Sequence, residues 1–175
     1  MRNLLIAFLL ISLIYPASGQ SIKNETYYDS VISGLVLRNP ESITTTFKNP
    51  DLDLNYYVDD TIAVSKDGLQ VIELMFHPGG TTNEVYEFRI NYNTTGKTSP
   101  LILKDNQLIT GKGIQLGLTK KEVKKQLGKP TSKETKNGEA IWKYKRNLDM
   151  EDLYFGKYTF KKDKLVEFWF GDAYP

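Results

Sequence analysis

The chain contains no cysteine and only one histidine among its 175 residues. Without cysteine there is no disulfide, no thiolate nucleophile and no cysteine to carry a lipid. A Ser–His–Asp triad would have to use His77, which precedes Pro78-Gly79-Gly80 and is interpreted as a turn residue. Zinc sites need three or four ligands, usually His or Cys. The sequence therefore predicts no catalytic residues, no metal site and no cofactor.

One stretch has the acidic spacing of a calcium loop but lacks its other requirements. Within residues 51–55, every second side chain offers an oxygen atom. Tyr56 stands where such a loop needs glycine, and Ile62 stands where it needs a bidentate glutamate. We interpret the stretch as the start of a strand.

The chain also lacks an apolar run long enough to cross a bilayer, which takes about 20 residues. The run Leu4–Tyr15 has 12 residues, follows Arg2 and precedes the small residues 17–19. This pattern predicts a signal peptide over residues 1–19, with no transmembrane segment after cleavage. Removing 19 of the 175 residues would leave 156, enough for one domain or two small ones. An exported protein without cysteine is more typical of the bacterial periplasm or exterior than of the eukaryotic secretory route. Since no cysteine is present to carry a lipid, we expect a protein that is not lipid-anchored.

The net charge of +2 hides two halves of opposite sign. Residues 20–111 contain 7 basic and 12 acidic residues, a net charge of −5, whereas residues 112–175 contain 15 basic and 9 acidic residues, a net charge of +6. Such halves can attract each other or maintain solubility, and the basic half can also bind an anionic partner. Nucleic acid is not expected as that partner, because the protein is exported and has no stacking motif of an RNA-binding sheet.

The most clearly specified element is a short helix over Lys120–Leu127. Thr119 and Glu122 have the spacing of a capping box, in which each side chain bonds the backbone N–H of the other residue. Val123 and Leu127 give the helix one apolar side, so we expect it to pack on another element.

Two more helices are expected in the first half of the chain. Asn39 suits an N-cap and Pro40 suits the first helical position, which predicts a helix that starts there. The apolar residues of Ser21–Val36 recur at helical spacing and predict a short helix that ends at Gly34.

Most of the remaining chain alternates apolar and polar residues, which is typical of half-buried strands. Hairpin turns are predicted at Asp67-Gly68 and at Asn137-Gly138. The predicted strands are Asn55–Val58, Thr61–Ser65, Gln70–Phe76, Glu84–Asn91, Leu101–Leu103, Ser132–Lys136, Glu139–Arg146, Tyr154–Lys161 and Leu165–Phe170.

The two halves also resemble each other. Val71–Phe76 matches Leu165–Phe170 class for class, and each follows a charged turn. We infer an internal repeat with a period of about 90 residues. The predicted fold class is α+β, with tandem duplicated helix plus antiparallel-sheet modules at 20–99 and 113–175, a bridge at 100–112 and the helices on one sheet face. The pattern is compatible with two separate sheets and with one joined sheet.

Alternation assigns the strand residues to two faces. The face expected beneath the helices carries Ile62, Val64, Ile72, Leu74, Phe76, Tyr86, Phe88, Ile90, Trp142, Tyr144, Tyr158, Phe160, Val166, Phe168 and Phe170. The helix-free face is expected to carry Val71, Glu73, Met75, Val85, Glu87, Arg89, Ile141, Lys143, Phe155, Lys157, Leu165, Glu167 and Trp169.

The second half resembles a known family. The segments GIQLGLTKKEV at 113–123, LGKP at 127–130, WKY at 142–144 and KDKLV at 162–166 are similar to the β-lactamase-inhibitor-protein-like domain and to the small outer-membrane lipoprotein of the β-barrel assembly machine. The resemblance covers Lys112–Gly171 well and the first half only weakly.

This resemblance implies helices on one face of an antiparallel sheet and a noncatalytic binding role. The inhibitor is itself a tandem of two such domains, whose joined sheet offers a concave protein-binding face. The present chain lacks the cysteine of the lipoprotein and the disulfides of the inhibitor. It is also similar to uncharacterised exported proteins of Gram-negative bacteria, which implies a periplasmic or extracellular location.

Candidate partner-binding residues lie on the expected helix-free face. They are Glu73, Met75, Lys143, Phe155, Glu167 and Trp169. Met75 and Trp169 are large apolar residues at matching positions of the two halves, and such residues dominate binding hot spots. A loop, the N-terminal segment or the other half could instead cover them. Glu73 and Glu167 also match the two carboxylates of a glycosidase, although solvated strand residues would show the same pattern.

The predicted helix Lys120–Leu127 has a strongly basic side, formed by Lys120, Lys121, Lys124 and Lys125. It is either a solvated helix face or a site for an anionic lipid headgroup or acidic polysaccharide. We therefore expect a noncatalytic exported protein that binds another protein of the envelope or exterior through its helix-free sheet face. The alternative is that an envelope glycan or anionic lipid binds to the lysine helix and the outward aromatic residues.

Overall fold

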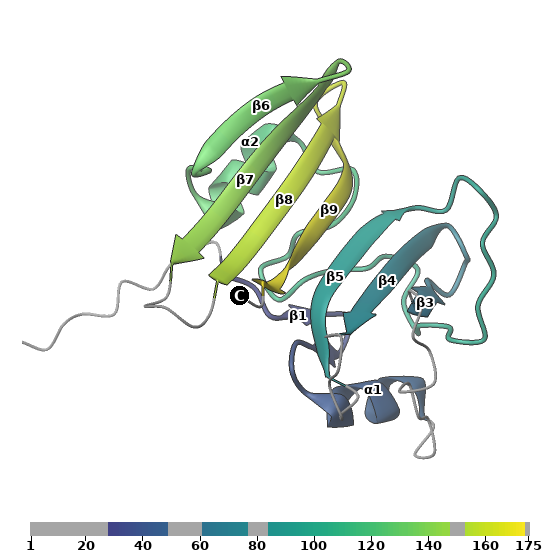
Figure 1. The fold of residues 1–175 in the computed structure, drawn as a ribbon. Helices are drawn as coiled ribbons and strands as arrows, with labels where there is room; N and C mark the ends of the chain where they lie inside the picture. The colour runs from purple at the N-terminus through teal and green to yellow at the C-terminus, as the bar shows by residue number, and fades with distance from the viewer. Residues whose placement is uncertain (1–27, 49–60, 77–83, 148–152, 174–175) are drawn as a thin grey trace, which may run out of the picture.

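The computed structural model describes residues 28–48, 61–76, 84–147 and 153–173. Figure 1 shows one large antiparallel sheet, a small ribbon and two short helices. The sheet has seven strands in the order β3-β4-β5-β9-β8-β7-β6. Its strands are β3 (Thr61–Val64), β4 (Gln70–Phe76), β5 (Val85–Tyr92), β6 (Ser132–Lys136), β7 (Glu139–Asn147), β8 (Leu153–Lys161) and β9 (Lys164–Ala173). The ribbon is β1 (Val31–Ile32) with β2 (Leu35–Val36), and the helices are α1 (Pro40–Phe47) and α2 (Lys120–Leu127).

The strands of both halves belong to this one sheet, because residues 87–91 of β5 pair with residues 167–171 of β9. Two separate sheets would each leave an additional edge of unpaired backbone N–H and C=O groups, and the β5–β9 pairing satisfies both edges. The described chain is mostly strand, with two helices of eight residues each. The expected α+β fold of tandem helix-plus-sheet modules is therefore wrong.

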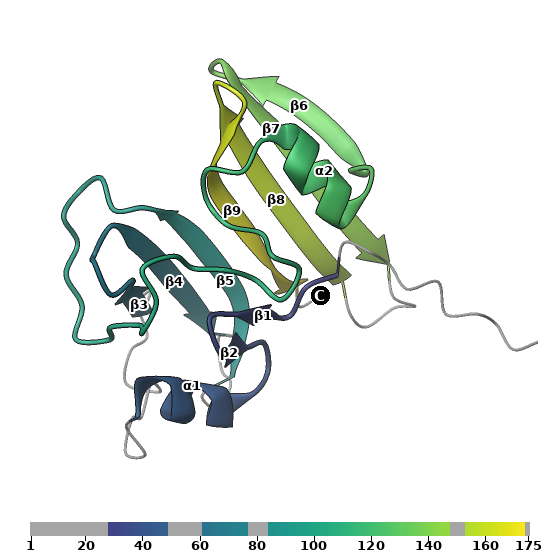
Figure 2. The same ribbon diagram turned by 180° about the vertical axis from the view of Figure 1, so that it is seen from behind.

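The two helices are also not equivalent covers of the sheet. In Figure 2, α2 lies in front of β7 and β8, and it buries Val123 and Leu127 completely. Helix α1 lies beside the β1–β2 ribbon, where the hydroxyl of Ser42 accepts a 3.0 Å hydrogen bond from the backbone of β2. The ribbon and the chain after β5, with buried Leu103 and Leu108, supply the remaining cover of the β3–β5 half.

The β1–β2 ribbon replaces the helix expected over Ser21–Val36, of which residues 28–36 are described. Ser33 and Gly34 form its turn with φ angles of 46° and 90°, a conformation that glycine adopts without strain. Ile32 pairs with Leu35, and both side chains are fully buried. The apolar residues whose spacing indicated a helix therefore lie in two short paired strands.

The local capping signals are confirmed. The Thr119 hydroxyl accepts a 3.3 Å hydrogen bond from the Glu122 backbone N–H, and the Glu122 carboxylate accepts a 2.7 Å bond from the Thr119 N–H. At α1, the Asn39 side chain accepts a 3.3 Å bond from the Ser42 N–H, and Pro40 is the first helical residue. The turn at Asn137-Gly138 is also as predicted.

Two β-bulges change which residues face the core. The registers of β4–β5 and β8–β9 each shift by one residue, so Tyr86 and Val166 have no paired residue on β4 and β8, respectively. Val85 and Leu165 are consequently buried in the core. Strict alternation placed Val85 and Leu165 on the helix-free face, and that prediction is wrong.

Strand β3 is also offset from the predicted register. Ala63 lies opposite Ile72, so Ile62 and Val64 share the face of Glu73. The prediction that Ile62 and Val64 face the helices is therefore wrong. Residues of β3 alternate between the two faces as predicted, but the register of β3 against β4 depends on the turn between them.

Aromatic side chains fill the covered face of β7, β8 and β9 as predicted. Tyr158 stacks on Phe168 at 6.1 Å between ring centroids, and Phe168 stacks on Phe170 at 6.3 Å. Tyr144 packs edge-on against Tyr158 and donates a 3.1 Å hydrogen bond to the Gly128 carbonyl oxygen. Burial raises the pKa of Tyr144 to about 12, so its hydroxyl stays protonated and fixes the end of α2.

Candidate functional site

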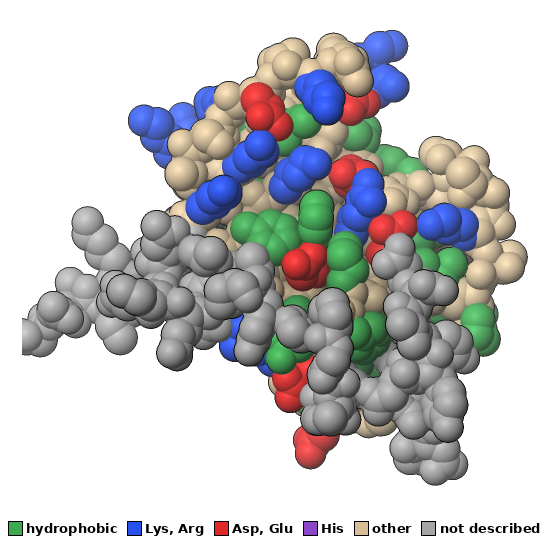
Figure 3. All heavy atoms as spheres, viewed as in Figure 1, with side chains coloured by type: hydrophobic (Ala, Val, Ile, Leu, Met, Phe, Trp, Pro, Cys, Tyr) green, Lys and Arg blue, Asp and Glu red, His purple; other side chains and the backbone are tan. Residues whose placement is uncertain are grey.

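The six predicted partner-binding residues all lie on the helix-free face of the sheet. They are Glu73 and Met75 on β4, Lys143 on β7, Phe155 on β8, and Glu167 and Trp169 on β9. The register places five side chains of this face directly opposite one another across five strands: Glu73, Arg89, Trp169, Lys157 and Lys143. All six predicted residues are half-buried. Figure 3 views this face and shows hydrophobic side chains with Lys, Arg, Asp and Glu around them.

Trp169 is held in a fixed position on this face. Its ring meets that of Phe155 edge-on, with 5.2 Å between centroids. Its indole N–H donates a 2.9 Å hydrogen bond to the Glu87 carboxylate. Glu87 and Phe155 lie opposite Gly171 on the two neighbouring strands, so the indole lies over the position where Gly171 has no side chain. The ring is therefore oriented before any partner arrives.

The Glu87 carboxylate supplies a testable pH dependence. Burial raises its pKa, and the hydrogen bond from Trp169 lowers the pKa by less. The folded state then holds the proton more tightly than the unfolded state. The free energy of unfolding should accordingly fall as the pH rises from the ordinary pKa of 4.5 through the higher folded value.

Glu87→Gln should remove this part of the pH dependence, because the amide oxygen still accepts from Trp169 but does not ionise. Urea denaturation between about pH 4 and pH 8 measures it. Asp105→Asn, at an exposed carboxylate on the chain after β5, is the control for the removal of one negative charge. Parallel stability curves for Glu87→Gln and wild type would contradict the prediction.

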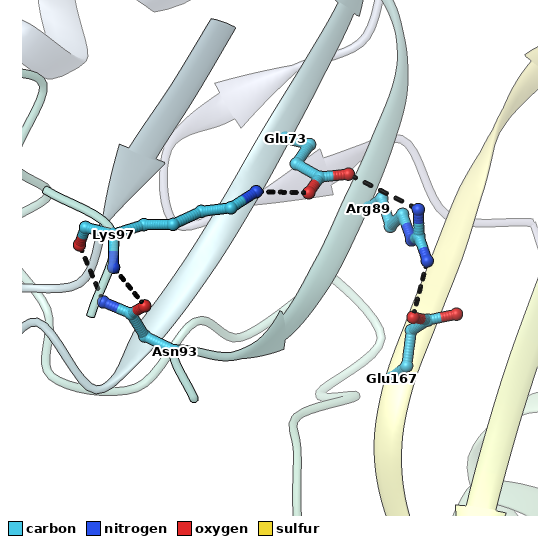
Figure 4. Close-up of polar contacts among 5 residues, drawn as sticks. All are labelled: Glu73, Arg89, Asn93, Lys97 and Glu167. Carbon is cyan, nitrogen blue, oxygen red and sulfur yellow. Dashed lines mark hydrogen bonds and ion pairs between the residues drawn. The ribbon is translucent and has the colours of Figure 1, made fainter. Parts of the chain in front are cut away.

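A chain of ion pairs crosses the junction between the two halves (Figure 4). Lys97 lies 3.2 Å from Glu73, and Glu73 lies 3.6 Å from Arg89. Arg89 also contacts Glu167 at 2.9 Å. Glu73 and Glu167, the two carboxylates considered for a glycosidase mechanism, are thus both bound to one guanidinium group.

Asn93 positions the loop that carries Lys97. Its side-chain amide donates to the carbonyl oxygen of Lys97, and its oxygen accepts from the Lys97 N–H (Figure 4). The same amide also donates to the carbonyl oxygen of Gly68. The sequence contained no signal for this role, because the loop has no periodic pattern. The period-two pattern predicts Arg89 and Lys157 on this face, but it contains no signal that distinguishes them as site residues.

A groove with a volume of about 610 Å³ opens on the same face. Its floor is a row of directly opposed residues, namely Val71, Asn91, Glu167, Thr159 and Ile141. Residues 92–95 and Lys97 line one side, and Lys157, Lys161 and Glu139 also line the groove. Its volume is within the usual range of ligand sites, about 300–1,000 Å³.

The predicted anion-binding lysines lie on α2, which packs on the opposite side of the sheet (Figures 1 and 2). Lys121, Lys124 and Lys125 are exposed. Lys120 is half-buried, lies 3.9 Å from Asp163 and has its ammonium group 5.9 Å from the centroid of the Phe160 ring. The structure therefore separates the two candidate binding surfaces.

Several predictions concern residues outside the described ranges. These are the signal peptide at 1–19, the calcium-like stretch 51–55, the strand Asn55–Val58 and the turn at His77. The described ranges contain no helix long and apolar enough to span a membrane. They also contain no group of three or more His, Cys, Asp or Glu side chains that could hold a metal ion. Comparisons with protein-family models, curated proteins and solved structures found no match to this chain.

Proposed function

We propose that this protein is a noncatalytic, exported binding protein that engages another protein through the helix-free face of its sheet. The observation that carries the proposal is the fixed, half-buried indole of Trp169, which contacts Phe155 and Glu87 on a face without helices. Rigid aromatic side chains with one polar edge are typical of binding hot spots. Met75 lies in the row of Glu87, Gly171 and Phe155, and adds a flexible apolar side chain to this surface.

The noncatalytic part of the proposal is supported by the ion pairs of the two carboxylates that a glycosidase mechanism would use. Glu73 and Glu167 are both paired with Arg89, so one guanidinium group of the chain itself already engages both carboxylates. Export is supported by the signal-peptide pattern at residues 1–19, and we place the protein in the periplasm or exterior of a Gram-negative bacterium. We further infer that residues 112–171 are related to the β-lactamase-inhibitor-protein-like domain, as the order of α2 followed by β6 to β9 suggests.

Site-specific photo-crosslinking in the native cell tests the protein-binding function. A crosslinking residue at Phe155 or Met75 should yield a discrete adduct with another protein. The same residue at Lys121, on exposed α2, is the matched control and should not. Trp169→Ala should abolish the adduct from position 75, because it removes the central aromatic contact. Adducts from position 121 alone, or none from the sheet face, would contradict the proposal.

A second candidate function is supported by three exposed lysines on α2. Within the described ranges, Lys121, Lys124 and Lys125 have no carboxylate within 4.0 Å, so their charge is available to anionic lipid or glycan. Sedimentation with phosphatidylglycerol vesicles measures this binding. It should weaken steeply with salt and with replacement of the three lysines by glutamine, whereas Trp169→Ala should leave it unchanged.

A further inference from the structure

The helix-free face presents a regular series of side chains along β8. Phe155, Lys157, Thr159 and Lys161 all lie on this face, since each opposes a helix-free-face residue or lines the groove. Successive members are two residues apart, a spacing of about 6.8 Å in an antiparallel strand. An extended chain lying along β8 would repeat its own side chains at the same interval.

The charges of this surface are only partly matched within the chain. Three of its carboxylates have a cationic partner: Glu73 and Glu167 pair with Arg89, and Glu139 lies 4.0 Å from Lys161. The Glu87 carboxylate accepts the Trp169 indole N–H. Lys157 is different. Within the described residues it has no carboxylate within 4.0 Å, and its ammonium group lies 5.9 Å from the centroid of the Trp169 ring.

Lys157 also connects the two parts of the surface. It lines the groove together with Thr159 and Lys161, and it lies directly opposite Trp169 of the aromatic pair. A ligand that contacts both parts must pass this ammonium group. The ammonium group of Lys157 is unmatched, so a complementary ligand carries a negative charge at that point.

We propose that the groove and the aromatic pair together receive an extended, acidic segment of the partner protein, lying along β8. An aspartate or glutamate of the segment pairs with Lys157, and an apolar side chain two positions away packs on Phe155 and Trp169. This inference rests on the proposed protein-binding function and specifies the chemistry of the partner.

The test starts from a displayed library of random nine-residue peptides, selected on the whole protein and counter-selected on Trp169→Ala. The inference predicts enrichment of an acidic residue two positions from an apolar residue. Synthetic versions of the selected peptides are then measured by fluorescence polarisation. Replacing the acidic residue by Gln should weaken binding about two- to fivefold, as for a partly exposed ion pair.

A double-mutant cycle ties this effect to Lys157. The Gln-substituted peptide should lose no further affinity when the protein carries Lys157→Gln, because the interaction is already absent. Lys121→Gln on α2 is the matched control, and it should leave the cost of the peptide substitution at its full two- to fivefold value. Far-ultraviolet circular dichroism of each variant confirms that it folds.

The outcomes separate this inference from the function on which it rests. Peptides that depend on Trp169 but lack acidic enrichment, or that bind Lys157→Gln as they bind wild type, would overturn the acidic segment and leave protein binding in place. The absence of any peptide that depends on Trp169 would overturn both. Selected acidic peptides whose affinity depends on Lys121 would assign acid recognition to α2 and would also overturn the inference.

Discussion

The Gly171→Ala variant is expected to be less stable than the wild-type protein by about 3 kcal/mol, which is at the upper end for overpacking a buried site. A β-carbon at this position would lie 2.7 Å from the Cα atom of Glu87 and closer still to the carbonyl oxygen of Tyr86. Both obstacles are backbone atoms, so no side-chain rotation relieves the clash. Strands β5 and β9 would have to separate.

This separation would act on the junction that makes one sheet from two halves. Gly171 pairs with Glu87 at one end of the five-residue contact between β5 and β9. The bulge at Tyr86 lies next to this pair and brings the β5 backbone close to Gly171. We therefore expect Gly171→Ala also to displace the indole of Trp169, which bonds to Glu87.

Urea denaturation followed by tryptophan fluorescence measures the loss of stability. Gly96→Ala is the control, because nothing lies within 4 Å of the added carbon and only the φ of +67° is unfavourable. That change should cost about 1–2 kcal/mol. Equal losses for the two variants would show that β5 and β9 are not in close contact at Gly171.

Leu165→Ala is expected to destabilise the protein by about 2–5 kcal/mol, whereas Val166→Ala should cost less than about 1 kcal/mol. Leu165 is fully buried in the core. Val166 is half-buried and lines the groove on the opposite face. The contrast is informative because strict alternation predicts the reverse order.

The same denaturation experiment distinguishes the two assignments, since each variant removes aliphatic carbons from one of two adjacent residues. A larger loss for Val166→Ala than for Leu165→Ala would place Val166 inward and show that the bulge in β9 is absent. Similar small losses for both would mean that this end of β9 is not packed against the core.

Part of the candidate site could be predicted from alternation alone. Glu73, Trp169 and Lys143 share a face because the inward residues next to them are strongly apolar, and the structure places all three in one row. The role of Lys97 could not be predicted, since it depends on the loop held by Asn93. The groove depends on which strands are neighbours, which alternation does not encode.

The sequence by itself determined the elements whose energy comes from neighbouring residues. Thr119 and Glu122 satisfy each other's backbone N–H groups within one helical turn, so α2 begins at Lys120. Asn137 and Gly138 adopt the positive φ angles that a two-residue hairpin requires. These interactions span at most three residues and need no tertiary partner to be recognised.

Only the tertiary structure decided how these elements combine. The pairing of β5 with β9 joins residues about 80 positions apart, and its close approach is possible because Gly171 has no side chain. The bulges at Tyr86 and Val166 reverse the faces of neighbouring residues, because each adds one unpaired residue to its strand. Two strand edges pair where their backbone hydrogen bonds and the packing of their side chains are both satisfied. Whether both are satisfied depends on the whole chain and not on neighbouring residues alone.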